Sequence, residues 1–346
     1  MPVEVVGLLT KIGVGITNNE NAAVAAQMLL DGVESDLRVR VNRIITGVGS
    51  GSLMPRRALT SHVWVEGSLR GDVQPNSFGY ILAALGVAPT TMGSAPTYTH
   101  TFNYGASSPS RWLSVVHAYN DIARQEVFGG LAATRLRLGF DAERDEVLQF
   151  DMDLLGTYAA LFNSEYTVIP PGVGVDSKDP FVQALAIVET PSGTAIAQCI
   201  AADLEIATDR AIRWTARGSV FPRGHQPTIG MTVRGTIRLT FENDNFLKAF
   251  LNQVGAETYP LQHKNDPTAP TTSLTLKWTP ASNAQLTINI PKIVWTEISK
   301  PVRRNAVVEQ ELSFEALLDA SLGRGLQIVL VNNTSAYNPG AQIGGS

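Results

Sequence analysis

Residues 65–87 read VEGSLRGDVQPNSFGYILAALGV, and residues 233–255 read VRGTIRLTFENDNFLKAFLNQVG. Val65 lies 168 positions before Val233, and the two stretches align on that offset without a gap. Each begins with the period-two alternation of a strand and continues into a short apolar stripe with helical spacing. One strand-to-helix unit therefore occurs twice in the sequence. Identical residues at matching positions are Gly67 and Gly235, Arg70 and Arg238, and Phe78 and Phe246.

Further matches flank this unit in the same order in both halves. LRVRVNR at 37–43 resembles LEIATDR at 204–210, and VLQFDMDLL at 147–155 resembles VEQELSFEA at 308–316. A strand, a long loop, a strand, a helix and a hairpin thus recur in one order, which indicates an internal duplication.

The copies are separated by TVIPPGVGVDSKDP at 167–180, whose prolines and glycines are typical of a linker or a surface excursion. We predict a first module at 1–162, a linker at 163–180 and a second module at 181–346. The last residues, NNTSAYNPGAQIGGS, predict a mobile C-terminal tail. Because alternating strands far outnumber helical stretches, the sequence predicts a mainly β fold with short helices, in the α+β class.

Each copy carries one short helix with an apolar face. Asn76 and Asp244 stand where a side chain can cap the helix N-terminus. We expect the apolar faces to pack each helix against its own module. The predicted helix-packing residues are Phe78, Ile81 and Leu82 in the first copy and Phe246 and Phe250 in the second.

Composition excludes several classes of protein. Of the 346 residues, 44% are hydrophobic and 17% are charged, which suits packed cores and argues against disorder. The net charge is −4 and no Lys/Arg-rich run is present, so the basic stripe of a protein that grips nucleic acid is missing. The N-terminus lacks the features of a secretory signal, and no apolar run is long enough to span a bilayer. We expect a soluble protein made in a cytoplasm.

Residues that carry chemistry are scattered along the chain. There is one cysteine, Cys199, and no two of the five histidines have the spacing of metal ligands. Neither a GxSxG nucleophile motif nor a phosphate-binding loop is present. The sequence therefore predicts no catalytic residues, no cofactor, no cofactor-binding residues and no metal site, and we do not expect an enzyme.

An acidic pattern recurs in the two matching strands near 150 and 310. Its polar residues alternate against an apolar face, which is typical of a solvated sheet surface, and this is the interpretation that composition favours. A second interpretation is that both copies turn an acidic face toward one shared space, where like charge keeps a DNA backbone from sticking. Arg135 and Arg137 on the neighbouring strand could pair with these acids and weaken that field. The residues concerned are Gln149, Asp151, Asp153, Glu309, Glu311 and Ser313.

Several stretches together resemble the major tail tube proteins of long-tailed bacteriophages, in the version with two tube modules per chain. They span most of the chain in the family's order, and the chain looks closest to the version from an extremely long-tailed Thermus phage. The stretches are GSLRGDVQPNSFGYILAALG with YTHTF, KDPFVQALAIVETPSGTAIAQCIAADLEIATD, TVRGTIRLTFEND, LTINIPKIVW and ALLDASLGRGLQIVLVNN.

The resemblance implies two tandem β-sandwich modules, each with a flanking helix, that contribute strands to a ring-wide lumen barrel. It implies a structural virion protein that assembles into trimeric, pseudo-hexameric rings, because three chains supply six modules. The rings would stack into a non-contractile tail tube, the conduit for genome delivery. Implied partners are further copies of the chain, a tape measure protein, tail terminator and tip proteins, and double-stranded DNA in transient, non-specific passage, with no membrane and no metal. The implied location is the virion tail, after assembly in the host cytoplasm.

Two long loops are the candidates for contacts between stacked rings, 46–61 and 213–228. Long connections without structure of their own are often functional, although ordinary surface loops are an equal alternative. The residues chosen for their charged or apolar reach are Met54, Pro55, Arg56 and Arg57 in the first loop and Arg217, Phe221 and Arg223 in the second.

Two other functions stay open at this point. The first is a different part of a phage tail, such as a terminator, tail-tip or baseplate ring. The second is an adhesive or carbohydrate-binding β-sandwich, suggested only by the tripeptide Arg70-Gly71-Asp72. The second copy has Arg238-Leu239-Thr240 instead, so the repeated unit does not require the adhesion motif.

Overall fold

The computed structural model describes residues 10–46, 57–105, 110–119, 124–144, 146–163, 168–216, 219–226, 230–251, 269–281, 283–302 and 307–345. Within these ranges most residues lie in strands, accompanied by two short helices, α1 (Phe78–Ala83) and α2 (Asn245–Phe250), and a 3-10 turn, η3 (Gln183–Leu185). The predicted mainly β fold with short helices is confirmed.

The strands in chain order are β1 (Thr10–Thr17), β2 (Ala22–Val24), β3 (Met28–Leu30), β4 (Val33–Ser35), β5 (Arg38–Thr46), β6 (Arg57–Asp72), β7 (Thr90–Ser94), β8 (Thr97–Gly105), β9 (Trp112–Tyr119), β10 (Arg124–Asp141), β11 (Gln149–Gly156), β12 (Tyr158–Asn163), β13 (Ala186–Glu189), β14 (Cys199–Thr208), β15 (Ile212–Arg213), β16 (Gly224–His225), β17 (Met231–Thr240), β18 (Thr271–Ala281), β19 (Ala284–Ser299), β20 (Glu309–Ala316), β21 (Arg324–Asn332) and β22 (Gln342–Gly345).

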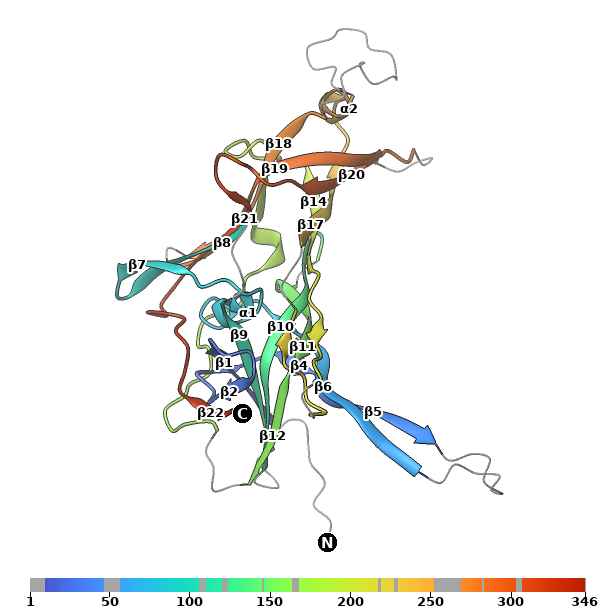
Figure 1. Cartoon of the computed structure of the whole chain (residues 1–346). Coiled ribbons are helices and arrows are strands. Elements are labelled where there is room, and N and C mark those ends of the chain that lie inside the picture. The colour runs from blue at the N-terminus through green and yellow to red at the C-terminus, as the bar shows by residue number, and fades with distance from the viewer. Residues whose placement is uncertain are drawn as a thin grey trace.

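One long antiparallel sheet runs through both halves of the chain (Figure 1). Its order is β5, β6, β11, β10, β14, β17, β20, β19. The last four strands follow one another as the first four do, and the contact between β10 and β14 joins the two sets. In Figure 1 the β5–β6 arm and β20 both extend to the right of this sheet, so the sheet bends toward the same side at both ends.

Two long strands, β10 and β19, each belong to two layers. The C-terminal half of β10 lies between β11 and β14, whereas its N-terminal half pairs with β9 and β12 in the second layer. In the same way β19 pairs with β20 through its C-terminal half and with β18 and β21 through its N-terminal half. A bulge, which bends a strand locally, interrupts the register at the matching place in both strands. It lies between Ala133 and Arg135 in β10 and between Trp295 and Glu297 in β19.

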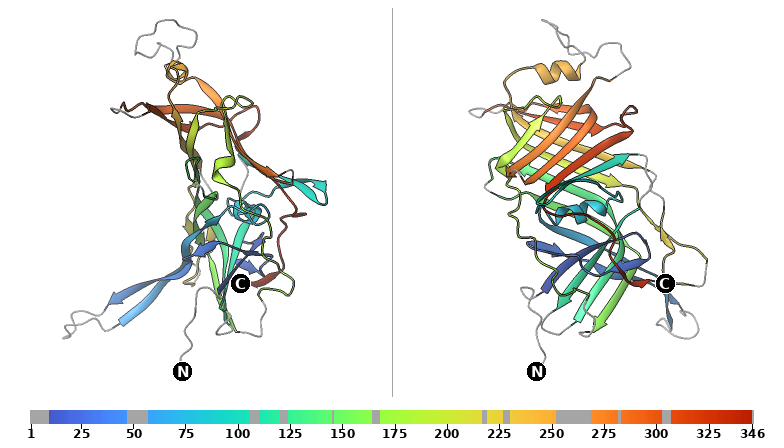
Figure 2. Two further views of the ribbon diagram at one scale, coloured as in Figure 1. Left: turned by 180° about the vertical axis from the view of Figure 1, so that it is seen from behind. Right: turned by 90° about the vertical axis from the view of Figure 1, so that its left-hand side faces the viewer.

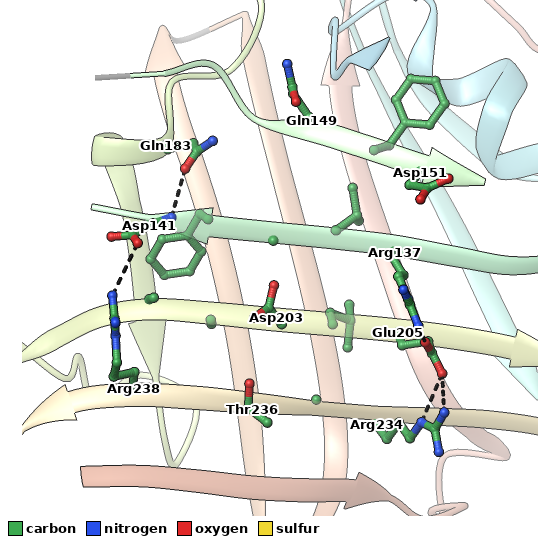
Figure 3. Close-up of a pocket in the computed structure, with 18 of the residues that line it drawn as sticks. Arg137, Asp141, Gln149, Asp151, Gln183, Asp203, Glu205, Arg234, Thr236 and Arg238 are labelled. Atoms are coloured by element: carbon green, nitrogen blue, oxygen red, sulfur yellow. Dashed lines mark hydrogen bonds and ion pairs between the residues drawn. The ribbon is translucent and has the colours of Figure 1, made fainter. Parts of the chain in front are cut away.

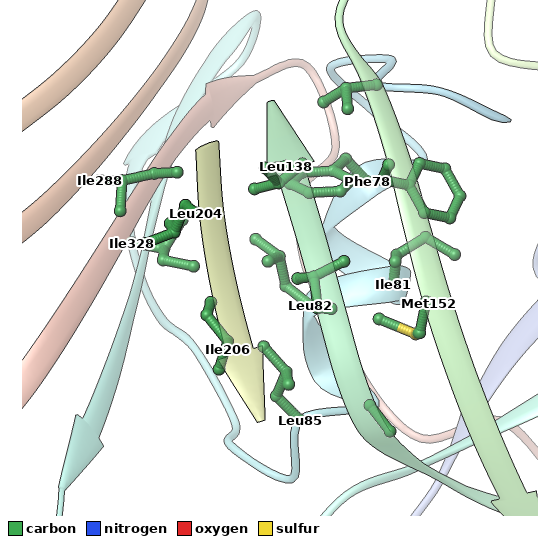
Figure 4. Close-up of a cluster of buried hydrophobic side chains, with 14 of the residues drawn as sticks. Phe78, Ile81, Leu82, Leu85, Leu138, Met152, Leu204, Ile206, Ile288 and Ile328 are labelled. Atoms are coloured by element: carbon green, nitrogen blue, oxygen red, sulfur yellow. The ribbon is translucent and has the colours of Figure 1, made fainter. Parts of the chain in front are cut away.

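The hydrophobic core fills the space between these layers (Figure 4). Alternate residues of the long sheet point into it, among them Leu136 and Met152, which are fully buried. All six residues of α1 are buried, including Phe78, Ile81 and Leu82. In contrast, α2 has no fully buried residue, although Phe246 and Phe250 do pack against the core. Phe246 and Phe250 are half-buried there, and the Phe246 ring meets Trp295 at 6.0 Å.

The two halves of the sequence are interlocked. Strand β8 from the first half pairs along its length with β21 from the second, and the two lie side by side in Figure 2. The C-terminal segment returns to the first half, where β22 pairs with β2 and Tyr337 is buried against Tyr80 of α1. The predicted mobile tail is thus corrected, because these residues are packed and hydrogen-bonded.

The segment 168–182 is built into the first half as well. Val168 and Phe181 are buried, and so is Asp176, which lies beside the turn that leads into α1. Its carboxylate accepts hydrogen bonds from the backbone N–H groups of Asn76 and Ser77, both at 2.8 Å. The side chain of Asn76 does not cap the helix, because its Oδ1 accepts the N–H of Asn333 instead. The side-chain cap predicted at Asn76 is therefore not formed: Ser77 is the N-cap, it makes no side-chain cap hydrogen bond, and Asp176 instead binds the turn that leads into α1.

Candidate functional site

A polar trough of about 1280 Å³ lies on the face of the long sheet that points away from the core (Figure 3). Its floor is made by β6, β11, β10, β14, β17 and β20, so residues from both halves of the chain line one surface. Alternation in these strands places polar side chains here and apolar ones in the core. The pattern on β11, where exposed or half-buried residues alternate with buried ones, shows this directly.

The six residues of the predicted acidic pattern all lie on this outward face of β11 and β20. Gln149, Asp151, Glu311 and Ser313 line the trough itself. Asp153 and Glu309 occupy positions two residues along the same strands, which places them on the same face. The structure therefore brings both strands of the pattern onto one surface.

Arginines neutralise most of the acids in the first half of this face. Asp151 pairs with Arg70 at 3.2 Å, and Asp153 pairs with Arg135 at 2.6 Å. The pairing considered for Arg135 is present, whereas Arg137 turns toward the neighbouring strand β14 and not toward Asp151. Asp151 and Arg137 stand directly opposite each other in the β10–β11 ladder, but the ion pair of Arg137 is with Glu205.

Glu205 is the centre of an ion-pair cluster that sequence reasoning missed. Its carboxylate accepts hydrogen bonds from Arg137 at 2.7 Å and from Arg234 at 2.5 and 2.9 Å (Figure 3). Burial raises the pKa of Glu205, but the bonds from the two arginines outweigh it, and the net pKa lies below its ordinary value. The cluster spans β10, β14 and β17, so it ties the two halves of the sheet together. The alternation of LEIAT predicts only the face on which Glu205 lies, because the partners come from distant strands.

In the second half of the face, some of the acidic side chains that line the trough form no ion pair within the part of the chain that the structure describes. Arg238 pairs with Asp141 at 3.2 Å and lies 3.9 Å from Glu309. None of the ion pairs among the described residues involves Glu311 or Glu315, although both line the trough. Glu311 and Glu315 thus add negative charge to this face, together with Asp203, which lines the trough and is likewise in none of these ion pairs.

The first predicted stacking loop is largely a β-arm. Strands β5 and β6 pair from Arg38 opposite Glu66 to Thr46 opposite Arg57, and the arm projects from the body of the molecule (Figure 1). The expectation of a long unstructured loop at 46–61 is wrong for residues 57–61, which are strand. Met54, Pro55 and Arg56 lie outside the described residues.

The second predicted loop lies against the base of this arm. Val63 of β6 donates its N–H to the carbonyl oxygen of Val220 at 2.9 Å, and the Trp214 ring lies 4.1 Å from the ring of His62. Its ends pair as the two-stranded sheet β15–β16, with the N–H of Arg223 bonded to Arg213. Phe221 is 57% exposed, which keeps it available for a contact outside the chain. Arg217 lies outside the described residues.

A family model for phage tail tube proteins matches residues 7–316, which is most of the chain. The chain belongs to the phage tail tube family. It is therefore a structural component of the virion tail, in a family known for building tubes and not for catalysis. A tail tube protein associates with copies of itself into the tube.

Other comparisons add little. None of the curated proteins matches the chain. Two solved structures of the Pseudomonas putida toluene transporter TodX, one of them the deltaS2 mutant of this monoaromatic hydrocarbon channel, show 8% sequence identity over 94% of this chain and 88% of theirs. Their TM-scores are 0.10 for the mutant and 0.09 for the other structure, so this likeness carries no argument.

Features of other classes of protein are not found in the described part of the chain. No helix there has the length and apolar character needed to cross a membrane. No group of three or more His, Cys, Asp or Glu side chains in these ranges could hold a metal ion. Burial raises the pKa of the Cys199 thiol to about 12, which makes it a poor nucleophile at neutral pH. Arg70-Gly71-Asp72 lies within β6, paired with β11, and is not on a free loop.

Proposed function

We propose that three copies of this chain close into a pseudo-hexameric ring and that such rings stack into a non-contractile tail tube, the conduit for the phage genome. The partners are further copies of the chain, a tape measure protein within the growing tube, and terminator and tip proteins at its ends. We also propose that this chain resembles the tail tube protein of an extremely long-tailed Thermus phage. The tube has no cofactor and performs no reaction.

The recurrence of strand pairing supports two tube modules per chain. The neighbours β6–β11 and β17–β20 pair in the same register: Leu69 stands opposite Met152, and Ile237 stands opposite Leu312. The bulges of β10 and β19 fall at the same point relative to these pairs. Each chain then supplies two wall segments, with the modules divided near 163–180, and three chains supply six.

The curvature of the long sheet supports a closed ring. Both ends bend toward the side of the polar trough, so the charged face is on the inside of the curve (Figure 1). A subunit with different surfaces at its two ends makes head-to-tail contacts, which close into a ring when the rotation per subunit divides a full turn. Closure also removes open strand edges, which otherwise invite uncontrolled pairing.

The trough supports a passive channel wall. Its arginines are engaged in ion pairs with Asp151, Asp153, Glu205 and Asp141, so few positive charges are free to hold phosphates. Glu311 and Glu315, which are in none of the ion pairs among the described residues, add negative charge, and this charge repels a DNA backbone. In this proposal Gln149, Ser313 and the acids beside them line the lumen.

Electron microscopy of the purified protein tests the proposal. We expect hollow filaments of indefinite length, built from rings with three subunits. Assembly that stops at a single ring would indicate a terminator or baseplate component instead. A protein that stays monomeric under all assembly conditions would refute the tube.

Thiol labelling tests which face lines the channel. Glu311→Cys is compared with Met92→Cys, because Met92 is exposed and belongs to β7, a strand that projects on the opposite side of the molecule from β20 (Figure 1). Both should react with a maleimide on a large polyethylene glycol in the monomer, whereas only Met92→Cys should react in tubes. The raised pKa of Cys199 keeps the background low. Equal labelling of Glu311→Cys in tubes and monomers would place this face outside the channel.

A further inference from the structure

Two strand edges of the long sheet are unpaired at its ends. Strand β5 pairs with β6 along one edge, and within the described ranges its other edge has no partner. Residues 295–299 of β19 likewise pair only with β20. An open edge presents a row of unpaired N–H and C=O groups that can accept another strand.

The contact between β10 and β14 joins the two halves of the chain, and it serves as a template for the contact that the two free edges could make. In this contact Leu136 stands opposite Ile206, and both side chains are fully buried. One position further along, Arg137 stands opposite Glu205, and the two form an ion pair at 2.7 Å. Seven consecutive residue pairs make this joint between the two halves of the chain.

Each strand of this joint has a counterpart at a free edge. Ile206 stands opposite Val233 on β17 as Val39 stands opposite Val65 on β6, so β5 is the counterpart of β14. Leu136 stands opposite Met152 on β11 as Ile298 stands opposite Leu312 on β20, so the end of β19 is the counterpart of β10.

We propose that β5 of one chain pairs antiparallel with residues 295–299 of β19 in the next chain, in the register of the β10–β14 joint. The proposal rests on the ring of three chains and names the strands and residues that close it. The predicted opposite pairs are Glu297 with Arg40, Ile298 with Val39 and Ser299 with Arg38.

Burial of the matching residues supports this pairing. Ile206 is 0% exposed at the internal joint, whereas its counterpart Val39 is 45% exposed on β5. Val41, on the same face of β5, is 42% exposed. Ile298 is half-buried, whereas its counterpart Leu136 is fully buried. The pairing covers apolar side chains at the very positions that the internal joint covers.

Charge is complementary in the same register. Glu297 and Arg40 are both exposed, and opposite residues of a ladder point to the same face. At the internal joint the ion pair joins Arg137 and Glu205, whereas the matching pair Ser299 and Arg38 carries one charge only. The ion pair is thus moved by two residues along the strand, which keeps it on the polar face.

Disulfide trapping tests the register. Arg38→Cys combined with Ser299→Cys should give a covalent species that stops at three chains when preformed tubes are oxidised. The matched control is Val39→Cys combined with Ser299→Cys, which should not cross-link, because a slip of one residue turns a side chain to the other face. Cross-linking of the control alone would overturn the register. Tubes that form but cross-link in neither variant would overturn the choice of strands and leave the tube itself standing.

Charge reversal tests the same contact without oxidation. Glu297→Arg places like charges opposite each other, and we expect the protein concentration needed for assembly to rise at least about tenfold. The double variant Glu297→Arg with Arg40→Glu should restore assembly, whereas Arg40→Glu alone should not. Urea unfolding of the monomers checks that each variant is folded. Normal assembly of folded Glu297→Arg would contradict the proposal, whereas a wild-type protein that forms no rings would refute the proposed function itself.

Discussion

The guanidinium of Arg210 donates a hydrogen bond of 2.7 Å to the carbonyl oxygen of Leu85, just beyond the last turn of α1. It also reaches the carbonyl oxygen of Ala84 at 3.4 Å, and the side chain comes from the second half of the chain. Burial lowers the pKa of Arg210 to about 10, so the group stays protonated at neutral pH. A buried cation thus donates hydrogen bonds to the carbonyl groups at the end of a helix in the other half.

Replacement of Arg210 by alanine should destabilise the monomer. The change leaves the buried carbonyl oxygen of Leu85 without this donor, whereas the carbonyl oxygen of Ala84 keeps the N–H of Ala133, and a hydrogen bond to a charged group contributes about 1.5–3 kcal/mol. We expect the free energy of unfolding in urea to fall by at least about 2 kcal/mol. A loss below about 0.5 kcal/mol would show that water replaces the guanidinium at no cost.

Arg43 is the counterpart of Arg210 on β5, but it is exposed in the single chain. Under the proposed pairing it would lie near the C-terminal end of α2 in the next chain. Arg43→Ala should therefore leave the urea stability of the monomer within about 0.5 kcal/mol of wild type, as expected for a surface change. Tube assembly, followed by light scattering, should need a higher protein concentration. Unchanged assembly would indicate that Arg43 stays in solvent.

Asp176→Ala should lower stability although the residue lies in the segment predicted as a linker. The buried carboxylate binds the backbone N–H groups of Asn76 and Ser77 and the side-chain amide of Asn76. The buried donors that lose their partner in this variant cost about 1–3 kcal/mol. Thermal unfolding should occur at a lower temperature than in Asp179→Ala, a control nearby in the same segment. Equal midpoints would show that the hydrogen bonds of Asp176 do not stabilise the fold.

Acid should weaken the folded chain before most carboxylates titrate. Burial lowers the pKa of His100, His117 and His225, whereas an unfolded histidine has a pKa of about 6.5. Below about pH 6.5 the unfolded chain therefore binds protons that the folded chain excludes, and stability falls as the pH drops from there toward the folded pKa values. Each histidine contributes a slope of at most about 1.4 kcal/mol per pH unit.

Urea unfolding at pH 7.5, 6.5 and 5.5 measures this slope. His225→Gln should reduce it by one histidine's share, because glutamine can still donate to the carbonyl oxygen of Gly130, which His225 Nε2 contacts at 2.6 Å. Stability that does not change with pH across this interval would show that the buried histidines titrate alike in both states.

The sequence predicted the fold best where the signal is local. Alternation located the strand Gln149–Gly156 and the acidic face on it, because side chains of a strand point to opposite sides in turn. The apolar stripe of Phe78, Ile81 and Leu82 located a helix in the same way. The matched stretches also indicated the recurrence of strand, helix and hairpin.

Contacts between distant residues could not be predicted. Asp176 binds the backbone of Asn76, 100 residues away, and the local sequence around neither residue predicts this contact. The ion pairs of Glu205 depend on which strands become neighbours, and alternation alone says nothing of that order. Similar sequence also did not guarantee similar packing, because Gly79 of α1 lies against the buried ring of Tyr337, whereas the matching residue of α2 is Leu247.

The return of the C-terminal segment sets the order in which the chain can fold during synthesis. Tyr337 is buried against α1, and Gln342–Gly345 pairs with the strand at Ala22–Val24, so the first half is completed by residues that follow the strands of the second half in the sequence. A domain usually folds as soon as its own residues have emerged from the ribosome. Here the first half cannot be completed until the strands of the second half have been synthesised as well.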